Sequence, residues 1–315
     1  MAEVLVLSEA DVAALLEVDE LLAALADAFR ALSAGRASVP PRVAANAEAG
    51  LLGAMPVHLP GVALGAKLVA VFPGNHAAGQ PSHQALVALF GEADGTPLAL
   101  MDGTRITALR TGAAAAVAAG ALARRDAAVL AILGAGVQGA SHLETFPHVR
   151  DFREIRVASR TPAHAAALAA RHPAAAAAGS FEEAVRGADV VACCTDAREP
   201  VLEAAWLAPG VHVSSVGGTF GPELDAATVQ RARVFVEWRG AASNPPPAGA
   251  HDLQGLDPDG ITEVGEVLAG TRPGRTSADE VTVYKSTGHA VEDAAAARLV
   301  YDRARRAGAG VTVTI

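Results

Sequence analysis

The sequence predicts an α/β protein in which a doubly wound parallel sheet is joined to a separate α+β domain. From Ala127 onward, short apolar segments alternate with helical segments, which is the pattern of a parallel sheet with crossover helices. The first apolar segment leads directly into a Gly-x-Gly-x-x-Gly sequence. Residues 39–100 differ, because their short apolar runs are separated by Pro-Gly and Asp-Gly turns without helices between them.

Length and composition fit this two-domain prediction. The chain has 315 residues, 51% of them hydrophobic, and many of these are alanines that favour helices. No apolar run of about 20 residues is free of breakers, so no membrane span is expected. The first residues include acids and lack a basic stretch, so they do not resemble a signal peptide. We therefore expect a cytoplasmic protein with no membrane partner.

Charge and cysteine content exclude other classes. The net charge is −9 with acids and bases interspersed, which argues against nucleic acid as a partner. Cys193 and Cys194 are adjacent in an apolar run, so they are expected to be core residues rather than a disulfide.

The first domain should open with one helix and continue as a sheet. Residues 8–34 carry apolar side chains at helical spacing, with Ser8 as a cap and Gly35 as a stop. A long alanine-rich helix is expected near 105–122. The expected strands between these two helices are the apolar runs 51–57, 62–72, 84–90 and 97–102.

The second domain should alternate strands and helices. A Pro-, Gly- and Asp-rich loop over 240–260 has no readable chemistry, and the last helix could return to the first domain. The expected strands are 127–133, 154–159, 189–194, 212–217, 234–238 and 281–286, and the expected helices are 139–150, 162–171, 181–186, 225–231, 262–269 and 289–307.

The glycine loop predicts a Rossmann dinucleotide site. Gly134 permits a tight turn, Gly136 lets the backbone approach a pyrophosphate, and Gly139 lets the helix pack closely on its strand. The start of that helix, with Val137 and Gln138, offers free N–H groups to the phosphates. The sequence therefore predicts a bound nicotinamide dinucleotide, with a generic glycine turn as the alternative.

The end of the next predicted strand bears on which dinucleotide is bound. NAD sites usually place an acid about 20 residues after the glycines, where this chain has Ser159, Arg160 and Thr161. A guanidinium flanked by hydroxyls suits a 2′-phosphate. We expect NADP(H) to be preferred and NAD(H) to be possible, unless Arg160 is only a solvated loop residue.

Three cations stand alone among apolar residues of the first domain. Arg42, Lys67 and Arg110 each need a partner, because burying an unpaired charge is costly. Each could meet an acid from a nearby strand. Together they favour a pocket for an anion, most simply the carboxylate of a small amino-acid-derived substrate.

Seven segments in order resemble the ornithine cyclodeaminase/μ-crystallin family. The resemblance implies a homodimer, and it implies that Arg42, Lys67 and Arg110 bind the substrate carboxylate. It also implies a substrate-binding and dimerisation domain over 1–112, completed by the C-terminal helix 289–315, and a Rossmann domain over 113–288. The segments are GAKLVAVFPGN, PSHQALVALF, DGTRITALRTGAAAAVAA, LAILGAGVQGASHLE, SRTPAHA, ELDAAT and VYKSTGHAVEDAAAARLVYDRA.

Two positions separate the chemistries found in this family. Cyclodeaminases place an acid where this chain has Thr219, and another just before Met-Pro, where it has Gly53-Ala54. Asp225 is a possible replacement acid, although its position favours a helix N-cap. Lys67, Thr219 or water could donate the proton. These features favour an NAD(P)H-dependent reductase of a small imine 2-carboxylate, of the pyrroline-2-carboxylate or ketimine type.

The alternatives are an ornithine cyclodeaminase, which makes proline and ammonia, and an alanine or opine-like amino-acid dehydrogenase. A nucleotide-dependent binding protein without turnover is an alternative from another class. The three cations weigh against that last reading.

Overall fold

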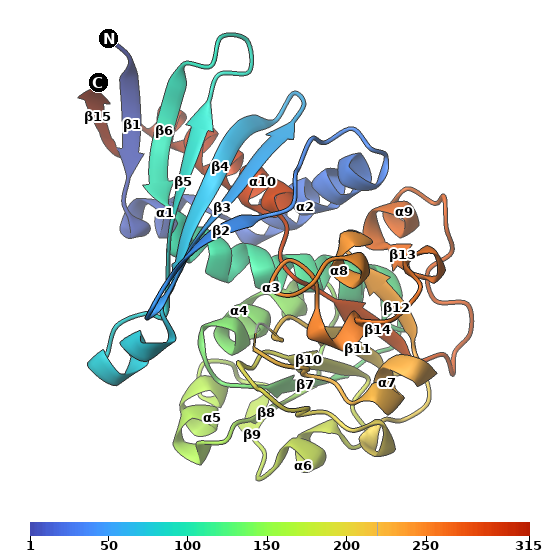
Figure 1. Cartoon of the computed structure of the whole chain (residues 1–315). Coiled ribbons are helices and arrows are strands. Elements are labelled where there is room, and N and C mark those ends of the chain that lie inside the picture. Colours follow the sequence, from blue (N-terminus) through green and yellow to red (C-terminus); the bar gives the residue numbers. More distant parts are fainter. Residues whose placement is uncertain (219) are drawn as a thin grey trace. The chain divides into compact units, whose positions relative to one another are not determined.

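The computed structural model describes residues 1–218 and 220–315, without the side chains of residues 76 and 77. The chain divides into two compact units (Figure 1). The terminal unit is Met1–Arg110 with His289–Ile315, and the central unit is Thr111–Gly288. Each unit has its own sheet, and the predicted α/β class is confirmed.

The terminal unit is built on a seven-stranded sheet in the order β15-β1-β6-β5-β4-β3-β2. Only β1 and β6 pair in parallel, and all other neighbours are antiparallel. The four predicted strands are present as β3, β4, β5 and β6. The strand bounds are β1 (Glu3–Leu7), β2 (Val43–Ala47), β3 (Gly50–Leu59), β4 (Ala63–Val71), β5 (His83–Phe90), β6 (Pro97–Asp102) and β15 (Val311–Thr314).

Helices cover one face of this sheet. Helices α2 (Val18–Ser33) and α10 (Ala290–Ala307) pack together, and α10 lies against β3 and β4 (Figure 1). Helix α3 (Gly103–Leu122) begins in the terminal unit and continues into the central one. A short 3₁₀ segment, Pro73–Ala78, joins β4 to β5.

The prediction of a single helix over 8–34 was wrong. The structure has α1 (Glu9–Leu15) followed by α2, with Leu16 and Glu17 in extended conformation between them. Val12 of α1 and Leu21 of α2 are both fully buried. The apolar spacing therefore runs through the break, and this is why helical periodicity did not reveal it.

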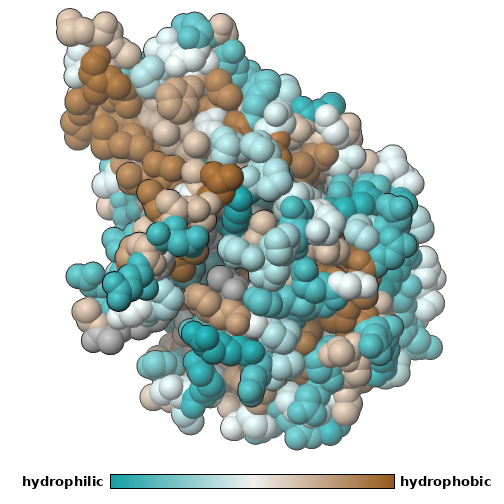
Figure 2. Space-filling view, viewed as in Figure 1, coloured by the Kyte–Doolittle hydropathy of each residue, from teal (hydrophilic) through white to brown (hydrophobic). Residues whose placement is uncertain are grey.

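The other face of the terminal sheet is apolar and exposed. Strand register places Leu52, Leu68, Leu86 and Leu100 on the same side, and each is at least 37% exposed. Figure 2 shows hydrophobic side chains gathered over these strands. Lys67 points to the opposite, helix-covered side, where its strand neighbours are Met55 and Val87.

The central unit contains an eight-stranded sheet in the order β13-β12-β14-β11-β10-β7-β8-β9, and all its pairs are parallel. This is the doubly wound sheet that the alternating pattern predicted. The strands are β7 (Val129–Leu133), β8 (Glu154–Ala158), β9 (Ala175–Ala177), β10 (Val190–Cys193), β11 (His212–Ser215), β12 (Arg233–Val236), β13 (Thr262–Glu263) and β14 (Thr282–Lys285).

The crossover helices of the central unit are short. The predicted helix 139–150 ends early, at Thr145, and continues only as a 3₁₀ turn, Phe146–His148. Cys193 and Cys194 are buried free thiols, as predicted. The α-helices are α4 (Val137–Thr145), α5 (Pro162–Ala169), α6 (Phe181–Val185), α7 (Ala226–Arg231), α8 (Gly240–Ser243) and α9 (Val264–Leu268), with further 3₁₀ turns at Ala204–Trp206, His251–Leu253 and Pro258–Gly260.

Within the described ranges 1–218 and 220–315, no helix has the length and apolar character needed to cross a bilayer. The same ranges contain no group of three or more His, Cys, Asp or Glu residues placed to hold a metal ion.

Candidate active site

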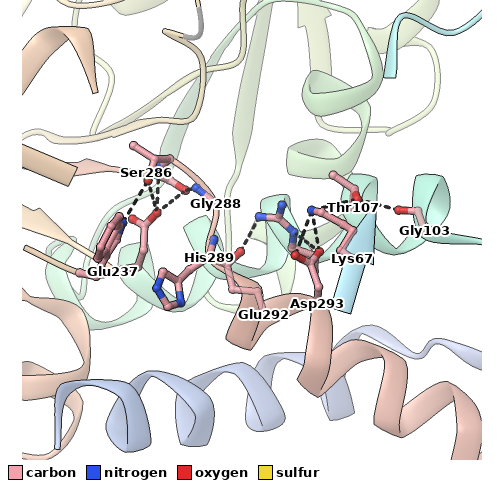
Figure 3. A network of polar contacts seen from close by, with 12 residues as sticks. Lys67, Gly103, Thr107, Glu237, Ser286, Gly288, His289, Glu292 and Asp293 are labelled. Atoms are coloured by element: carbon pink, nitrogen blue, oxygen red, sulfur yellow. Dashed lines mark hydrogen bonds and ion pairs between the residues drawn. The ribbon is translucent and has the colours of Figure 1, made fainter. Parts of the chain in front are cut away.

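A buried ion-pair cluster lies in the terminal unit between β4 and the start of α10. Lys67 is 3% exposed, and its Nζ lies 3.0 Å from Oδ1 and 2.9 Å from Oδ2 of Asp293. Nζ also lies 3.4 Å from Oγ1 of Thr107 on α3. Figure 3 shows the ammonium and the carboxylate pointing toward each other. Strand β4 thus delivers the cation and α10 the anion.

Arg110 joins this cluster from α3. Its Nε donates to Oδ1 of Asp293 at 3.0 Å, and its Nη1 donates to Oε2 of Glu292 at 2.6 Å. The other Glu292 oxygen accepts the backbone N–H of His289, which closes the first turn of α10. One acid therefore bridges Lys67 and Arg110, and the other fixes the far side of the guanidinium.

Burial and ion pairing act in opposite directions on these groups. Burial lowers the pKa of Lys67 to about 8, because the loss of water outweighs the attraction of Asp293. Burial alone would raise the pKa of Asp293, but Arg110 and Lys67 outweigh it and lower that pKa. Asp293 therefore stays ionised, and Lys67 is the member of the pair that loses its charge when the pH rises above about 8.

The neighbouring side chains complete the electrostatics. Burial lowers the pKa of His289 to about 4, so its imidazole is neutral near pH 7. Burial raises the pKa of Glu292. Arg42 precedes β2, and its charge lowers the pKa values of both Lys67 and His289. Lys67 thus lies among the charges of two arginines, Arg42 and Arg110, and of the carboxylates of Glu292 and Asp293.

The structure places Lys67 and Arg110 in one cluster, and it gives each of them an acidic partner. Glu292 and Asp293 were missed in the sequence analysis. Their position three and four residues after the helix cap His289 is typical of acids that stabilise a helix N-terminus. The available signal was the presence of three lone cations upstream and two adjacent acids in the otherwise apolar stretch 290–297.

The central unit holds the glycine loop between β7 and α4. Gly134 has φ +107°, and a Cβ there would meet the Cys194 carbonyl oxygen at 2.5 Å. A Cβ on Gly139 would collide with the Gly134 carbonyl. A Cβ on Gly136, by contrast, would project into open space. Gly136 is the N-cap of α4, and the exposed Val137 and then Gln138 follow it. These residues fit a pyrophosphate cradle.

Ser159, Arg160 and Thr161 follow the carboxyl end of β8. The Arg160 side chain is 82% exposed, and its Nη2 lies 3.4 Å from Oδ1 of Asp196. The Thr161 N–H donates to Ser159 Oγ at 3.3 Å, and Thr161 is the N-cap of α5. The guanidinium is thus accessible from solvent, with an acid beside it.

Two sequence-predicted acid–base candidates remain. Thr219 lies outside the described residues. Asp225 is the N-cap of α7, where Oδ1 accepts the Thr228 N–H at 2.8 Å and Oδ2 accepts the Ala204 N–H at 3.2 Å. Both carboxylate oxygens of Asp225 therefore hold backbone groups, in keeping with the helix-cap reading.

Comparison with known proteins connects this geometry to one family. The model of the ornithine cyclodeaminase/mu-crystallin family matches residues 2–308. Ketimine reductase mu-crystallin of Mus musculus is 41% identical over 257 residues, covering 80% of each chain.

Two solved structures are similar along nearly the whole chain. Delta(1)-pyrroline-2-carboxylate reductase of Thermococcus litoralis, in complex with NADH and L-proline, has a TM-score of 0.93 at 35% identity, covering 98% of this chain and 100% of the other. An archaeal alanine dehydrogenase dimer with bound NAD has a TM-score of 0.90 at 34% identity, covering 99% of both chains.

Proposed function

Because this chain belongs to the ornithine cyclodeaminase/mu-crystallin family, we propose that it is an NAD(P)H-dependent reductase of a small imine 2-carboxylate. The substrate class is a pyrroline-2-carboxylate or another ketimine, in which the carboxylate is attached to the C=N carbon. The terminal unit is proposed to bind the substrate and the central unit the dinucleotide.

The observation that carries this proposal is the set of basic side chains around Lys67. Lys67 and Arg110 share Asp293, Arg110 also pairs with Glu292, and the charge of Arg42 acts on Lys67 and on His289. A substrate carboxylate would bind among these cations. Such a site is strongly selective for anions, because water is excluded from the buried members.

Lys67 is the proposed proton donor as well as a carboxylate ligand. Its pKa of about 8 leaves it mostly protonated at pH 7 but able to release a proton readily. Asp293 and Thr107 hold the ammonium in place. When bound, the dinucleotide supplies the hydride to the imine carbon. The proton goes to the imine nitrogen, so C=N becomes CH–NH and the charge balances.

The cofactor preference is proposed separately. Related structures hold NADH or NAD, whereas we propose that NADP(H) is preferred here. The exposed Arg160, flanked by two hydroxyl side chains, supports this preference. Asp196 would have to release Arg160 for a 2′-phosphate to pair with it.

We further propose that the protein is a homodimer formed through the apolar outer face of the terminal sheet. The exposed leucines on this face form a contiguous row, whereas single exposed apolar residues are normal on a protein surface. A related alanine dehydrogenase is a dimer. A cytoplasmic location stays a prediction from the sequence.

Alanine dehydrogenase is the second candidate, because an archaeal alanine dehydrogenase is 34% identical over nearly the whole chain. Reductive amination of a 2-oxo acid also passes through an imine that bears a carboxylate, so the same cluster would serve it. Ornithine cyclodeaminase is less favoured, since Thr219 and Gly53 replace its acids.

The deciding experiment measures loss of reduced-nicotinamide absorbance with two substrate sets and ammonia release with a third. Pyrroline-2-carboxylate should be reduced with a kcat/KM well above that for pyruvate plus ammonia. Faster turnover of pyruvate plus ammonia would assign an alanine dehydrogenase. Ammonia release from ornithine would assign a cyclodeaminase, and no turnover with cofactor bound would indicate a binding protein.

A further inference from the structure

A second buried charge cluster lies in the central unit, at the carboxyl end of β14. Lys285 has no exposed surface, and its Nζ donates to Ser215 Oγ at 2.7 Å and to the Gly217 carbonyl at 2.9 Å. It also pairs with Asp252 Oδ2 at 2.7 Å, and the side chain of Asp252 is equally buried. A charged group at this depth needs these partners, and two chain segments, 215–217 and the turn at Asp252, provide them.

Two carboxylates surround this single ammonium. Asp252 Oδ1 accepts the backbone N–H groups of Glu223 and Leu224 at 2.7 and 2.8 Å. Glu223 Oε1 accepts from the N–H and Oγ1 of Thr195, both at 2.7 Å. Its Oε2 accepts from Ser215 Oγ at 2.7 Å and the Gly217 N–H at 2.9 Å. Four donors thus face Glu223, an arrangement that suits a carboxylate and not a carboxylic acid.

The other ionisable groups near this cluster do not change its charge. The Cys193 and Cys194 thiols stay protonated, because burial, together with Glu223, raises their pKa values well above normal. Arg198 lies in the loop after β10, but it is exposed and stacks on Phe220, so water screens its charge. The buried set of Lys285, Asp252 and Glu223 therefore carries one carboxylate more than it has cations.

The position of this cluster follows from the sheet topology. In a doubly wound sheet, the dinucleotide crosses the carboxyl edge with its pyrophosphate at the first glycine loop, here after β7. The adenosine half lies toward β8, where its ribose is recognised, so the nicotinamide half lies toward β10, β11 and β14. The cluster ties together the ends of these three strands.

The loop backbone directly covers the ion pair. Gly218 has φ +94°, and a Cβ there would lie 2.8 Å from Lys285 Nζ and 3.1 Å from Asp252 Oδ2. A Cβ on Gly217 would lie 2.5 Å from Glu223 Oε1. The backbone of Gly217 and Gly218 therefore lies directly against these charged side chains.

We propose that the Lys285–Asp252–Glu223 cluster is an electrostatic base beneath the nicotinamide, and that its excess negative charge favours the oxidised ring. The oxidised ring is a cation and the reduced ring is neutral, so a fixed negative charge binds the oxidised form more tightly. Bound reduced cofactor thereby becomes a stronger hydride donor. These are positioning and tuning residues, and their role rests on the proposed dinucleotide-dependent function.

The test compares dissociation constants for NAD⁺ and NADH, and for NADP⁺ and NADPH, by titration calorimetry without substrate. Glu223→Gln should weaken the oxidised form relative to the reduced form by at least about fivefold, since one charge near a bound ion commonly shifts an equilibrium by roughly tenfold. Lys285→Met should shift the ratio the opposite way. Glu223→Asp keeps the charge and should keep the ratio, even if both affinities fall.

Asp189→Asn is the matched control. Asp189 is also a carboxylate that accepts two backbone N–H groups and pairs with an arginine, but it precedes β10 at the amino edge of the same sheet. Its loss should leave the oxidised-to-reduced ratio unchanged.

Equal weakening of both forms by Glu223→Gln would show that the cluster only shapes the loops, and the proposal would be wrong. If Lys285→Met does not fold, the comparison of Glu223→Gln with Glu223→Asp decides the question alone. A wild-type protein that binds neither form would refute the proposed function instead.

Discussion

Replacing Lys67 by methionine distinguishes a substrate-binding ammonium from a purely structural ion pair. Methionine keeps the apolar stem of the side chain and removes the charge from a site that is 3% exposed. Asp293 loses its contacts to Nζ but keeps the 3.0 Å hydrogen bond from Arg110 Nε. The variant therefore leaves no unpaired buried carboxylate.

The expected loss of stability is small for a buried charge. Removing one member of a buried pair often costs about 3–5 kcal/mol, but here the remaining partner reduces this to about 1–2 kcal/mol. The lowered pKa of Lys67 shows that burying its ammonium is itself unfavourable. Removing the ammonium removes this cost and so offsets part of the stability lost with the ion pair.

The expected loss of activity is larger. A hydrogen bond to a charged group in a dry site contributes up to about 3 kcal/mol, which corresponds to about a hundredfold in kcat/KM for the imine. Steady-state kinetics and thermal melting on the same preparation measure both effects. Arg303→Met is the control, because it removes a cation of α10 that pairs with Glu20 at the surface.

The opposite pattern would refute the reasoning. If Lys67→Met keeps kcat/KM within about threefold of wild type while stability falls by about 3 kcal/mol or more, the ammonium is structural. Dinucleotide affinity should stay at the wild-type value in both variants.

Five further outcomes are expected. The kcat/KM of the wild type should decline above pH about 8 as Lys67 loses its proton, and a profile flat to pH 10 would exclude it as the donor. The contribution of Lys67 to the free energy of unfolding should rise as the pH increases from about 8 to 10.5, because the unfolded chain binds the Lys67 proton more tightly than the folded one. Gly136→Val should abolish dinucleotide binding in calorimetry without changing the melting temperature, since a Cβ at this position has no protein atom within 4 Å. Arg160→Ala should raise the KM for NADPH and leave that for NADH nearly unchanged, and equal effects would remove the case for a 2′-phosphate site. Leu68→Lys should yield monomers in light scattering if the outer face of the terminal sheet is the dimer contact.

The fold was largely predictable because local patterns carry it. Each central strand is an apolar run bounded by turns, so its existence and order could be read from the sequence. Strand β9 consists of three alanines, which favour helices, and it forms only because β8 offers an edge. Strand β15 likewise depends on pairing with β1.

The site was predictable only in part, because ion pairs between distant segments leave no local signal. Lys67 and Arg110 were identified as cations that need partners, but the sequence did not show that Asp293 serves both. Lys285 was placed on a strand without a partner being sought. Its contacts come from Ser215 at the end of β11 and from Asp252 in a 3₁₀ turn, and only the assembled sheet brings them together.

The cluster around Lys67 joins parts of the chain that are synthesised far apart in time. Lys67 and Asp293 are separated by 226 residues, and the whole central unit lies between Arg110 and His289. A nascent chain that has passed Gly288 holds a continuous central unit that is able to fold, while the terminal unit still lacks α10 and β15. Until α10 emerges, the two cations have no carboxylates and the helix-covered face of β3 and β4 is bare. The terminal unit should therefore complete its fold after the central unit.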